Sequence, residues 1–306
     1  MVFRFMGPLL ALGLALACGE EPPPPAAQPA PATPASPAAE APAPPATQAP
    51  ADPTLRLLAE ADAGSAGSQA TVALAYATGL GLPHDDALAL RYARLAAAQG
   101  EPDAQFLLGA LLQEGRGTAA DPTAALQSYL SAAKQGNVDA QIAAAELYLR
   151  GEGAPQDLKE AAHWQLEAAA RGNPDAQFQS GLLFMRGIGV LKDDAAGIRY
   201  FRDAARGGNA HAAFVLGVFY ENGESGLRAD MGEALRWYQI AAESGEAGAQ
   251  FVLGERYEQG RGVTASRDEA LRWYRLAAQQ GHEEAQRKLE RLERQPEPDA
   301  AAPGAR

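Results

Sequence analysis

A Gly-x-Gly break returns along this chain at an almost constant interval. The first glycine of each break occupies one of six positions, Gly79, Gly115, Gly151, Gly187, Gly223 and Gly260, so the intervals are 36, 36, 36, 36 and 37 residues. Self-similarity at such a period is typical of repeat proteins, in which each unit buries its apolar face by stacking on its neighbours. The sequence therefore predicts one array of similar units, and repeat arrays usually act by presenting a surface.

The fourth repeat shows how each unit makes two helices. Its first helix is expected over Pro174–Arg186, where Ala176, Gly181 and Phe184 recur at spacings that share one helical face. Small residues let neighbouring helix axes approach, and the aromatic side chain fills the space beside them. The Gly187-Ile188-Gly189 break then ends the helix, because glycine adopts the left-handed conformation that a helix C-cap needs.

Each second helix is expected to begin at a residue whose side chain caps it. These residues form one column of the repeat: Asp85, Asp121, Asp157, Asp193, Asp230 and Ser266. Such side chains accept hydrogen bonds from the first free amides, and each cap contributes about 0.5–2 kcal/mol. Pro122 suits the first helical position, and Ser266 with Glu269 has the spacing of a capping box.

Aromatic residues and paired alanines form two further columns in the second helices. The pairs are Trp164 with Ala168-Ala169, Tyr200-Phe201 with Ala204-Ala205, Trp237-Tyr238 with Ala241-Ala242, and Trp273-Tyr274 with Ala277-Ala278. An aromatic residue three or four positions before a small one lies on the same helical face, so ring and gap interlock. We therefore assign these rings to the core. Leu55–Ala63 and the charged segment His282–Arg294 are expected to be terminal capping helices.

These columns together resemble the SEL-one-like repeat, a relative of the tetratricopeptide repeat. The clearest copy runs from Ala249-Gln250-Phe251-Val252-Leu253-Gly254 to Trp273-Tyr274-Arg275-Leu276-Ala277-Ala278, and the resemblance covers Leu55 to Leu292. It implies an all-α fold, a right-handed α-solenoid of helix–turn–helix repeats of about 36 residues. The resemblance also implies a protein-interaction scaffold. An inserted residue near Gly226 is expected to lengthen one loop without breaking the stack.

The sequence divides into four segments. Residues 1–18 form an export signal that ends at Cys18, residues 19–53 form a tether, residues 54–294 form the solenoid, and residues 295–306 form a disordered tail. The stretch 22–53 contains 13 prolines and 12 alanines and almost no large apolar side chain, so it cannot form a core.

Cys18 is the only cysteine and follows the apolar run of the signal directly. The sequence Leu14-Ala15-Leu16-Ala17-Cys18 resembles a bacterial lipobox, which implies lipidation of Cys18 and, with Gly19 after it, anchoring to the outer membrane on its periplasmic side. Ala15-Leu16-Ala17 also satisfies the rule for ordinary signal cleavage, which would release a secreted soluble protein. Both outcomes stay open.

Composition and motifs limit the remaining functions. The net charge of -12 disfavours nucleic acid as a partner, and a single cysteine allows no intramolecular disulfide. The four histidines are scattered over different elements, and no metalloprotease, P-loop or nucleophile-elbow motif occurs. We therefore expect no catalytic, cofactor-binding or metal-binding residues, and the protein is not expected to be an enzyme. We also expect it to be a monomer.

First helices are expected to line the concave wall of the solenoid and to dock a protein or peptide partner. The side chains that vary between repeats at inward positions are the candidates: Gln179, Leu182, Met185, Val218, Phe219, Asn222, Glu255 and Arg256. Apolar members of this set favour a partner site, although packing between adjacent first helices explains them equally well. The alternative function is a weak envelope hydrolase or a carbohydrate-binding protein that acts on cell-wall material.

Overall fold

The computed structural model describes residues 52–294, and this range contains 14 helices and no strand. The helices are α1 (Pro53–Asp62), α2 (Ala66–Thr78), α3 (Asp86–Ala98), α4 (Pro102–Glu114), α5 (Pro122–Lys134), α6 (Val138–Arg150), α7 (Leu158–Ala170), α8 (Pro174–Arg186), α9 (Asp194–Arg206), α10 (Ala210–Asn222), α11 (Met231–Glu243), α12 (Ala247–Gln259), α13 (Arg267–Gln279) and α14 (Glu283–Arg294). The predicted signal, tail and tether lie outside this range, except for the last two residues of the tether.

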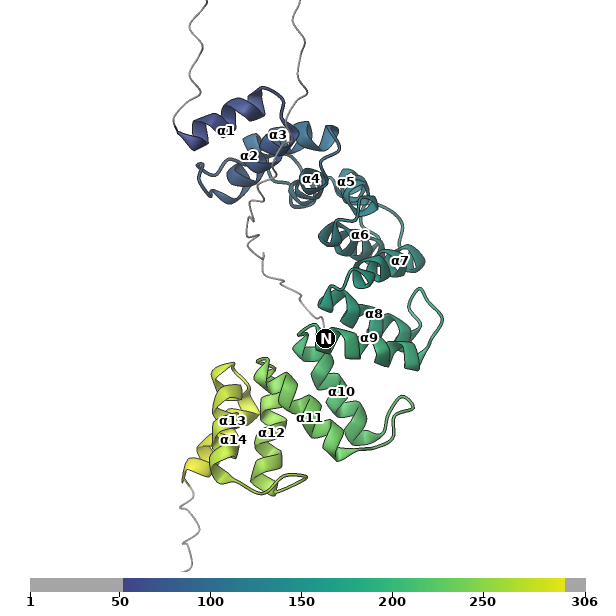
Figure 1. Ribbon diagram of the computed structural model, residues 1–306, viewed down its shortest axis with the longest axis vertical. Coiled ribbons are helices and arrows are strands. Elements are labelled where there is room, and N and C mark those ends of the chain that lie inside the picture. Colours follow the sequence, from purple (N-terminus) through teal and green to yellow (C-terminus); the bar gives the residue numbers. More distant parts are fainter. Residues whose placement is uncertain (1–51, 295–306) are drawn as a thin grey trace, which may run out of the picture. The chain divides into compact units, whose positions relative to one another are not determined.

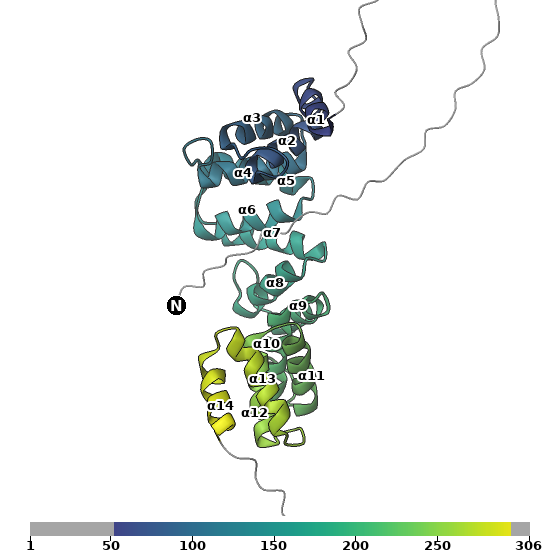
Figure 2. The ribbon, with the colours of Figure 1, turned by 90° about the vertical axis from the view of Figure 1, so that its left-hand side faces the viewer.

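The helices pack as consecutive hairpins. Each even-numbered helix from α2 to α12 packs against the odd-numbered helix that follows it, and each of those packs against the next even-numbered helix. Figure 1 and Figure 2 show these hairpins following one another in chain order. α1 packs on α2 and α14 packs on α13, so both ends of the described array carry an extra helix. The predicted all-α solenoid of helix–turn–helix repeats is confirmed.

All six predicted caps of the second helices are confirmed. Each of these side chains accepts a hydrogen bond from a backbone N–H in the first turn of its helix. Its own N–H donates back to the first helix of the same repeat, as in Asp193 N to Phe184 O at 3.0 Å. The capping box at Ser266 is only half formed, because the Ser266 N–H donates to Tyr257 O and the Glu269 carboxylate pairs with Arg272.

The two glycines of each break do different things. Gly187 caps α8 in the left-handed conformation, with φ 68°, as predicted. Gly189 also has a positive φ, and a Cβ at this position would lie 1.9 Å from the carbonyl oxygen of Leu158 in α7. The second glycine therefore lets the loop dock on the preceding repeat. In the longer loop of the fifth repeat, a Cβ on the corresponding Gly226 would meet no atom of another residue within 4 Å, yet α10 and α11 still pack together.

The small-residue column of the first helices faces rings from the second helices. A Cβ on Gly109, Gly181, Gly217 or Gly254 would lie 2.5–2.6 Å from the ring of Tyr129, Phe201, Tyr238 or Tyr274. The column holds alanine at Ala73 and Ala145, where the equivalent second-helix positions hold Ala93 and Gln165. Thus the ring that fills each gap comes from the second helix, whereas the sequence suggested a ring on the first helix.

Candidate functional site: the face of the first helices

The predicted partner residues lie on three consecutive first helices. α8 carries Gln179, Leu182 and Met185, α10 carries Val218, Phe219 and Asn222, and α12 carries Glu255 and Arg256. We call these eight residues the first-helix face. The repeat brings them to the same side of the array because they occupy the same few positions of each first helix.

The apolar residues of this face are half-buried. Leu182, Met185, Val218 and Phe219 pack against the core cluster of repeats four to six. The centroid of the Phe219 ring lies 6.1 Å from that of Phe201 in α9, and the Met185 sulfur lies 2.5 Å from where a Cβ on Gly197 would be. These side chains therefore contribute to packing between helices, and only part of each surface is open to a partner.

The charged residues of the face are engaged in ion pairs. Arg256 pairs with Glu221 of the preceding first helix, and its side chain is only 12% exposed. Glu221 also accepts a hydrogen bond from the Tyr238 hydroxyl at 2.8 Å; burial first, and this carboxylate second, raise the pKa of Tyr238. Glu255 lies 3.1 Å from Lys288 Nζ of α14. These ion pairs link α10 to α12 and α12 to the terminal helix α14, although the buried Arg256 Nε finds no partner within residues 52–294.

Gln179 and Asn222 are the polar residues of the face whose side chains make no hydrogen bond or ion pair to a neighbouring repeat. Gln179 is half-buried, and its side chain makes no hydrogen bond within residues 52–294. Asn222 is exposed and donates Nδ2–H to Glu224 of its own loop at 2.8 Å. A partner that docks here would meet these two polar groups beside the open parts of Leu182 and Val218.

The N-terminal ends of the first helices are linked by side chains. Asn209, which caps α10, donates Nδ2–H to Asp175 in the first turn of α8 at 2.7 Å. One repeat later the capping residue supplies the carboxylate instead of the donor. His211 Nδ1 of α10 lies 2.7 Å from Glu246, the cap of α12. The hydrogen bond between these two side chains raises the pKa of His211 and lowers the pKa of Glu246.

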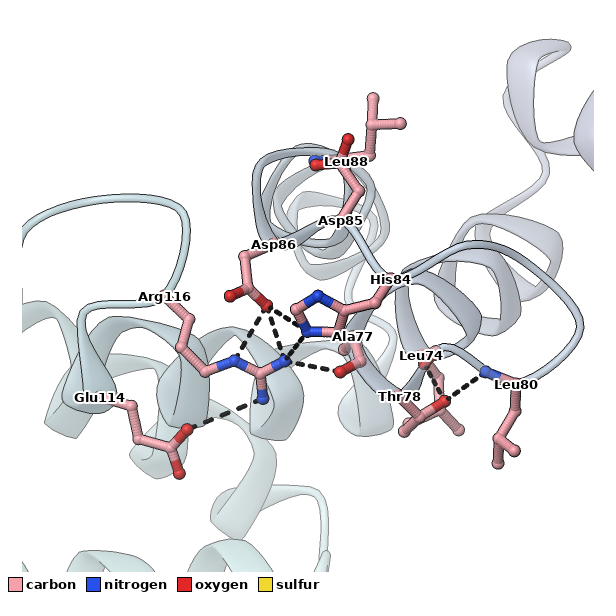
Figure 3. Close-up of polar contacts among 10 residues, drawn as sticks. All are labelled: Leu74, Ala77, Thr78, Leu80, His84, Asp85, Asp86, Leu88, Glu114 and Arg116. Carbon is pink, nitrogen blue, oxygen red and sulfur yellow. Dashed lines mark hydrogen bonds and ion pairs between the residues drawn. The ribbon is translucent and has the colours of Figure 1, made fainter.

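A polar cluster joins the first two repeats around Arg116 (Figure 3). Arg116 donates to Asp86 at 2.6 Å from Nη2 and 2.9 Å from Nε, and to the carbonyl oxygen of Ala77 at 2.5 Å. His84 Nε2 lies 3.2 Å from both Arg116 Nη2 and Asp86 Oδ1, and Glu114 lies 3.7 Å from the guanidinium. The hydrogen bond from Arg116 lowers the pKa of Asp86. The guanidinium therefore ties the loop of the second repeat to both helices of the first.

Two further properties concern metals and membranes. In the part of the chain that the structure describes, no group of three or more His, Cys, Asp and Glu side chains could hold a metal ion. Nor does any helix between residues 52 and 294 combine the length and the apolar character that crossing a membrane requires.

Comparison with solved structures finds two close matches. A Sel1 repeat protein from Oxalobacter formigenes is 34% identical, with a TM-score of 0.71 over 80% of this chain and 72% of that chain. A protective antigen present in uropathogenic Escherichia coli strains, which displays an SLR fold, is 31% identical, with a TM-score of 0.72 over 79% of this chain. This chain spans only 52% of the length of the E. coli protein. No curated protein matches the chain.

The family model for the Sel1 repeat matches the chain six times without a gap. The matched residues are 68–101, 102–137, 138–173, 174–209, 210–246 and 247–282. Each match contains one hairpin, from α2–α3 to α12–α13. Proteins built from this repeat are generally non-catalytic scaffolds for protein interactions. Together with the two solved relatives, these six matches show that the chain belongs to the Sel1 repeat family.

Proposed function

We propose that this protein is an exported bacterial lipoprotein that acts as a protein-interaction scaffold in the cell envelope. The observation that carries the proposal is the uninterrupted array of six Sel1 repeats, because such arrays act by presenting a continuous surface to a partner. The first-helix face is the proposed docking surface for one protein or peptide. The scaffold itself is a monomer, anchored to the periplasmic side of the outer membrane through Cys18, and a secreted soluble form is the alternative.

Site-specific photocrosslinking in the native cell tests the docking surface. A photoreactive residue replaces Gln179 in one variant and Asn222 in another, since both lie on the first-helix face. The controls replace Glu167 on α7 and Arg199 on α9, which are exposed on second helices. We expect the same protein to be captured from both first-helix positions and from neither control. Capture at equal yield from all four positions, or from none, would rule out docking on this face.

The membrane anchor is tested separately by mass spectrometry of the mature N-terminus. Lipidation predicts a mature chain that begins at Cys18 with a diacylglyceryl and acyl modification and that fractionates with the outer membrane. A mature chain with an unmodified Cys18, or one that begins after it and is recovered in soluble form, would contradict the anchor and support the secreted alternative.

A further inference from the structure

The second repeat lacks a pair of aromatic side chains that the other five repeats have. The pair joins the eleventh residue of the first helix to the seventh residue of the second helix, as in Tyr76/Tyr92, Tyr148/Trp164, Phe184/Tyr200, Tyr220/Trp237 and Tyr257/Trp273. Two of these pairs stack, with centroids 6.1 Å apart for Tyr76 and Tyr92 and 5.5 Å apart for Phe184 and Tyr200. The second repeat has Leu112 and Ser128 at the two positions.

A surface hollow of about 430 Å³ lies where the rings are missing. α3, α4 and α5 line it, and both Leu112 and Ser128 belong to the lining. Leu112 is buried and Leu108 half-buried, while Arg94, Gln127 and Ser131 of the lining are exposed. The hollow is open to solvent and combines an apolar floor with a polar rim.

We propose that this hollow binds an aromatic side chain, an indole or a phenol, that another protein presents. The fold itself indicates the shape of the guest, since five repeats of the same backbone place rings at these two positions. The rim offers a cation as well. In the fifth and sixth repeats an arginine lies over a ring, with Arg236 5.9 Å from the centroid of Trp237 and Arg272 4.8 Å from that of Trp273. In those two repeats the arginine directly precedes the ring on the same helix, where the second repeat has Gln127. Arg94 lines the hollow from α3 of the preceding repeat instead, so a cation is available to a bound ring there as well.

We assign the guest ring to a different protein. Residues 19–51 and 295–306 contain no aromatic residue, and Phe3 and Phe5 belong to the predicted export signal. Within residues 52–294 the exposed large hydrophobic side chains are leucines and one methionine, so this part of a second copy presents no exposed phenyl, phenol or indole ring. The hollow also lies on α3, α4 and α5, away from the first-helix face, so the inference does not depend on the proposed docking there.

Titration with N-acetyl-tryptophanamide tests the hollow directly. The chain without its export signal is labelled at the leucine methyl groups, and the resonances of Leu108 and Leu112 are followed by NMR. We expect both to shift and to saturate with a Kd of about 1 mM or tighter, which is the affinity that one small ring can supply. N-acetyl-leucinamide should bind at least tenfold more weakly. Equal shifts from the two compounds, or no shift at Leu108 and Leu112, would overturn the proposal.

Variants at Ser128 connect the binding to the missing ring. Ser128→Trp and Ser128→Tyr supply the ring that the other repeats carry, so each should weaken binding at least tenfold. Ser128→Ala leaves the hollow open and should bind like the unchanged chain. Binding that persists in a folded ring variant would overturn the proposal. Loss of helical circular dichroism in both ring variants would also overturn it, because it would show that the hollow has no room for a ring.

Discussion

At the scale of single residues, the packing between the two helices of a repeat depends on a match between a gap and a ring. Four first helices have glycine where the second helix offers an aromatic residue, and two have alanine where it offers Ala93 or Gln165. The chain thus varies the two positions together. A methyl group fits only where no ring approaches, because protein interiors are packed too densely to absorb an extra methyl group without strain.

This match predicts a strong coupling between Gly217 and Tyr238. A Cβ on Gly217 would lie 2.5 Å from the Tyr238 ring, so Gly217→Ala should destabilise the fold by about 1–3 kcal/mol. In a Tyr238→Gln background, which reproduces the third repeat, the clash is absent and the same substitution should stabilise by up to about 1 kcal/mol, because alanine favours the helix over glycine by about that amount. Urea unfolding of the four variants measures the coupling. An equal cost in both backgrounds would refute the match.

The sequence alone could predict the roles of residues whose partners lie only a few positions away in the chain. Asp193 caps α9 through an amide three residues away, so its role follows from the sequence alone. The ring that faces Gly181 could not be assigned, because it depends on which side of α9 meets α8. The half-formed capping box at Ser266 has the same origin, since the competing acceptor, Tyr257 O, belongs to another helix. The hollow of the second repeat was missed although Ser128 interrupts an otherwise aromatic column, which is the signal that could have found it.

At the scale of elements, the loops connect one repeat to the next. The carbonyl oxygen at the start of a second helix lies against the second glycine of the following loop, as Leu158 does against Gly189 and Pro122 against Gly153. The fifth-repeat loop is one residue longer, and its Gly226 has no such contact. Loop docking therefore strengthens some junctions between repeats and leaves the junction of the fourth and fifth without it.

Gly189 and Gly226 form a matched pair that tests this docking. Both have a positive φ, so alanine at either position carries a backbone strain of about 1–2 kcal/mol. At Gly189 the new methyl group would also collide with Leu158 O, so Gly189→Ala should cost at least about 1 kcal/mol more than Gly226→Ala. Chemical unfolding of the two variants gives the difference. Similar losses of stability would show that the loop moves away from α7 at little cost.

The ion pair between α10 and the cap of α12 predicts a pH dependence. The pKa of His211 is raised from 6.5, so its contribution is complete below about pH 6.5 and is lost as pH rises through the raised value. The pKa of Glu246 is lowered from 4.5, so its contribution is complete above about pH 4.5 and is lost as pH falls through the lowered value. The pair should therefore stabilise most between these limits.

His211→Gln tests this dependence. Because the His211 side chain is 66% exposed, solvent screens the pair and the loss should stay below about 1 kcal/mol. The difference in unfolding free energy between the unchanged chain and the variant should be largest near pH 5.5 and smaller at pH 8. Asn209, which makes the neighbouring contact to Asp175 without titrating, supplies the control variant Asn209→Ala. A difference for His211→Gln that does not vary with pH would contradict the assignment.

At the scale of the whole described array, the apolar core is not continuous. One large cluster contains buried residues from Ala61 to Trp164, and another contains buried residues from Ile198 to Trp273. Between them lies a small cluster of Ala168, Ala169 and Ala176. In a solenoid, stability is the sum of what each repeat and each interface contributes, so an interface with little apolar contact limits cooperativity. The break falls at the junction of the third and fourth repeats, and the third repeat has Gln165 where four other repeats have an aromatic ring.

Restoring that ring should therefore make the array more stable and more cooperative. Gln165 and Ser180 are buried with only long hydrogen bonds, of 3.3 Å from Gln165 Nε2 to Ala176 O and 3.4 Å from Ser180 Oγ to Gln165 O. The double variant Ala145→Gly/Gln165→Phe reproduces the pair of the fourth repeat. Burying the new ring stabilises by about 1.5–3 kcal/mol and the new glycine costs about 1 kcal/mol, so the net gain is about 1 kcal/mol.

For an array of this length the Tm should rise by about 2–4 °C, with a steeper transition in calorimetry. Gln165→Phe alone should be less stable than the double variant, because the ring would meet the Ala145 methyl group. A single variant more stable than the double variant would contradict this prediction. It would show that the introduced phenylalanine ring packs away from residue 145, so that the Ala145 methyl group does not limit contact across the third repeat.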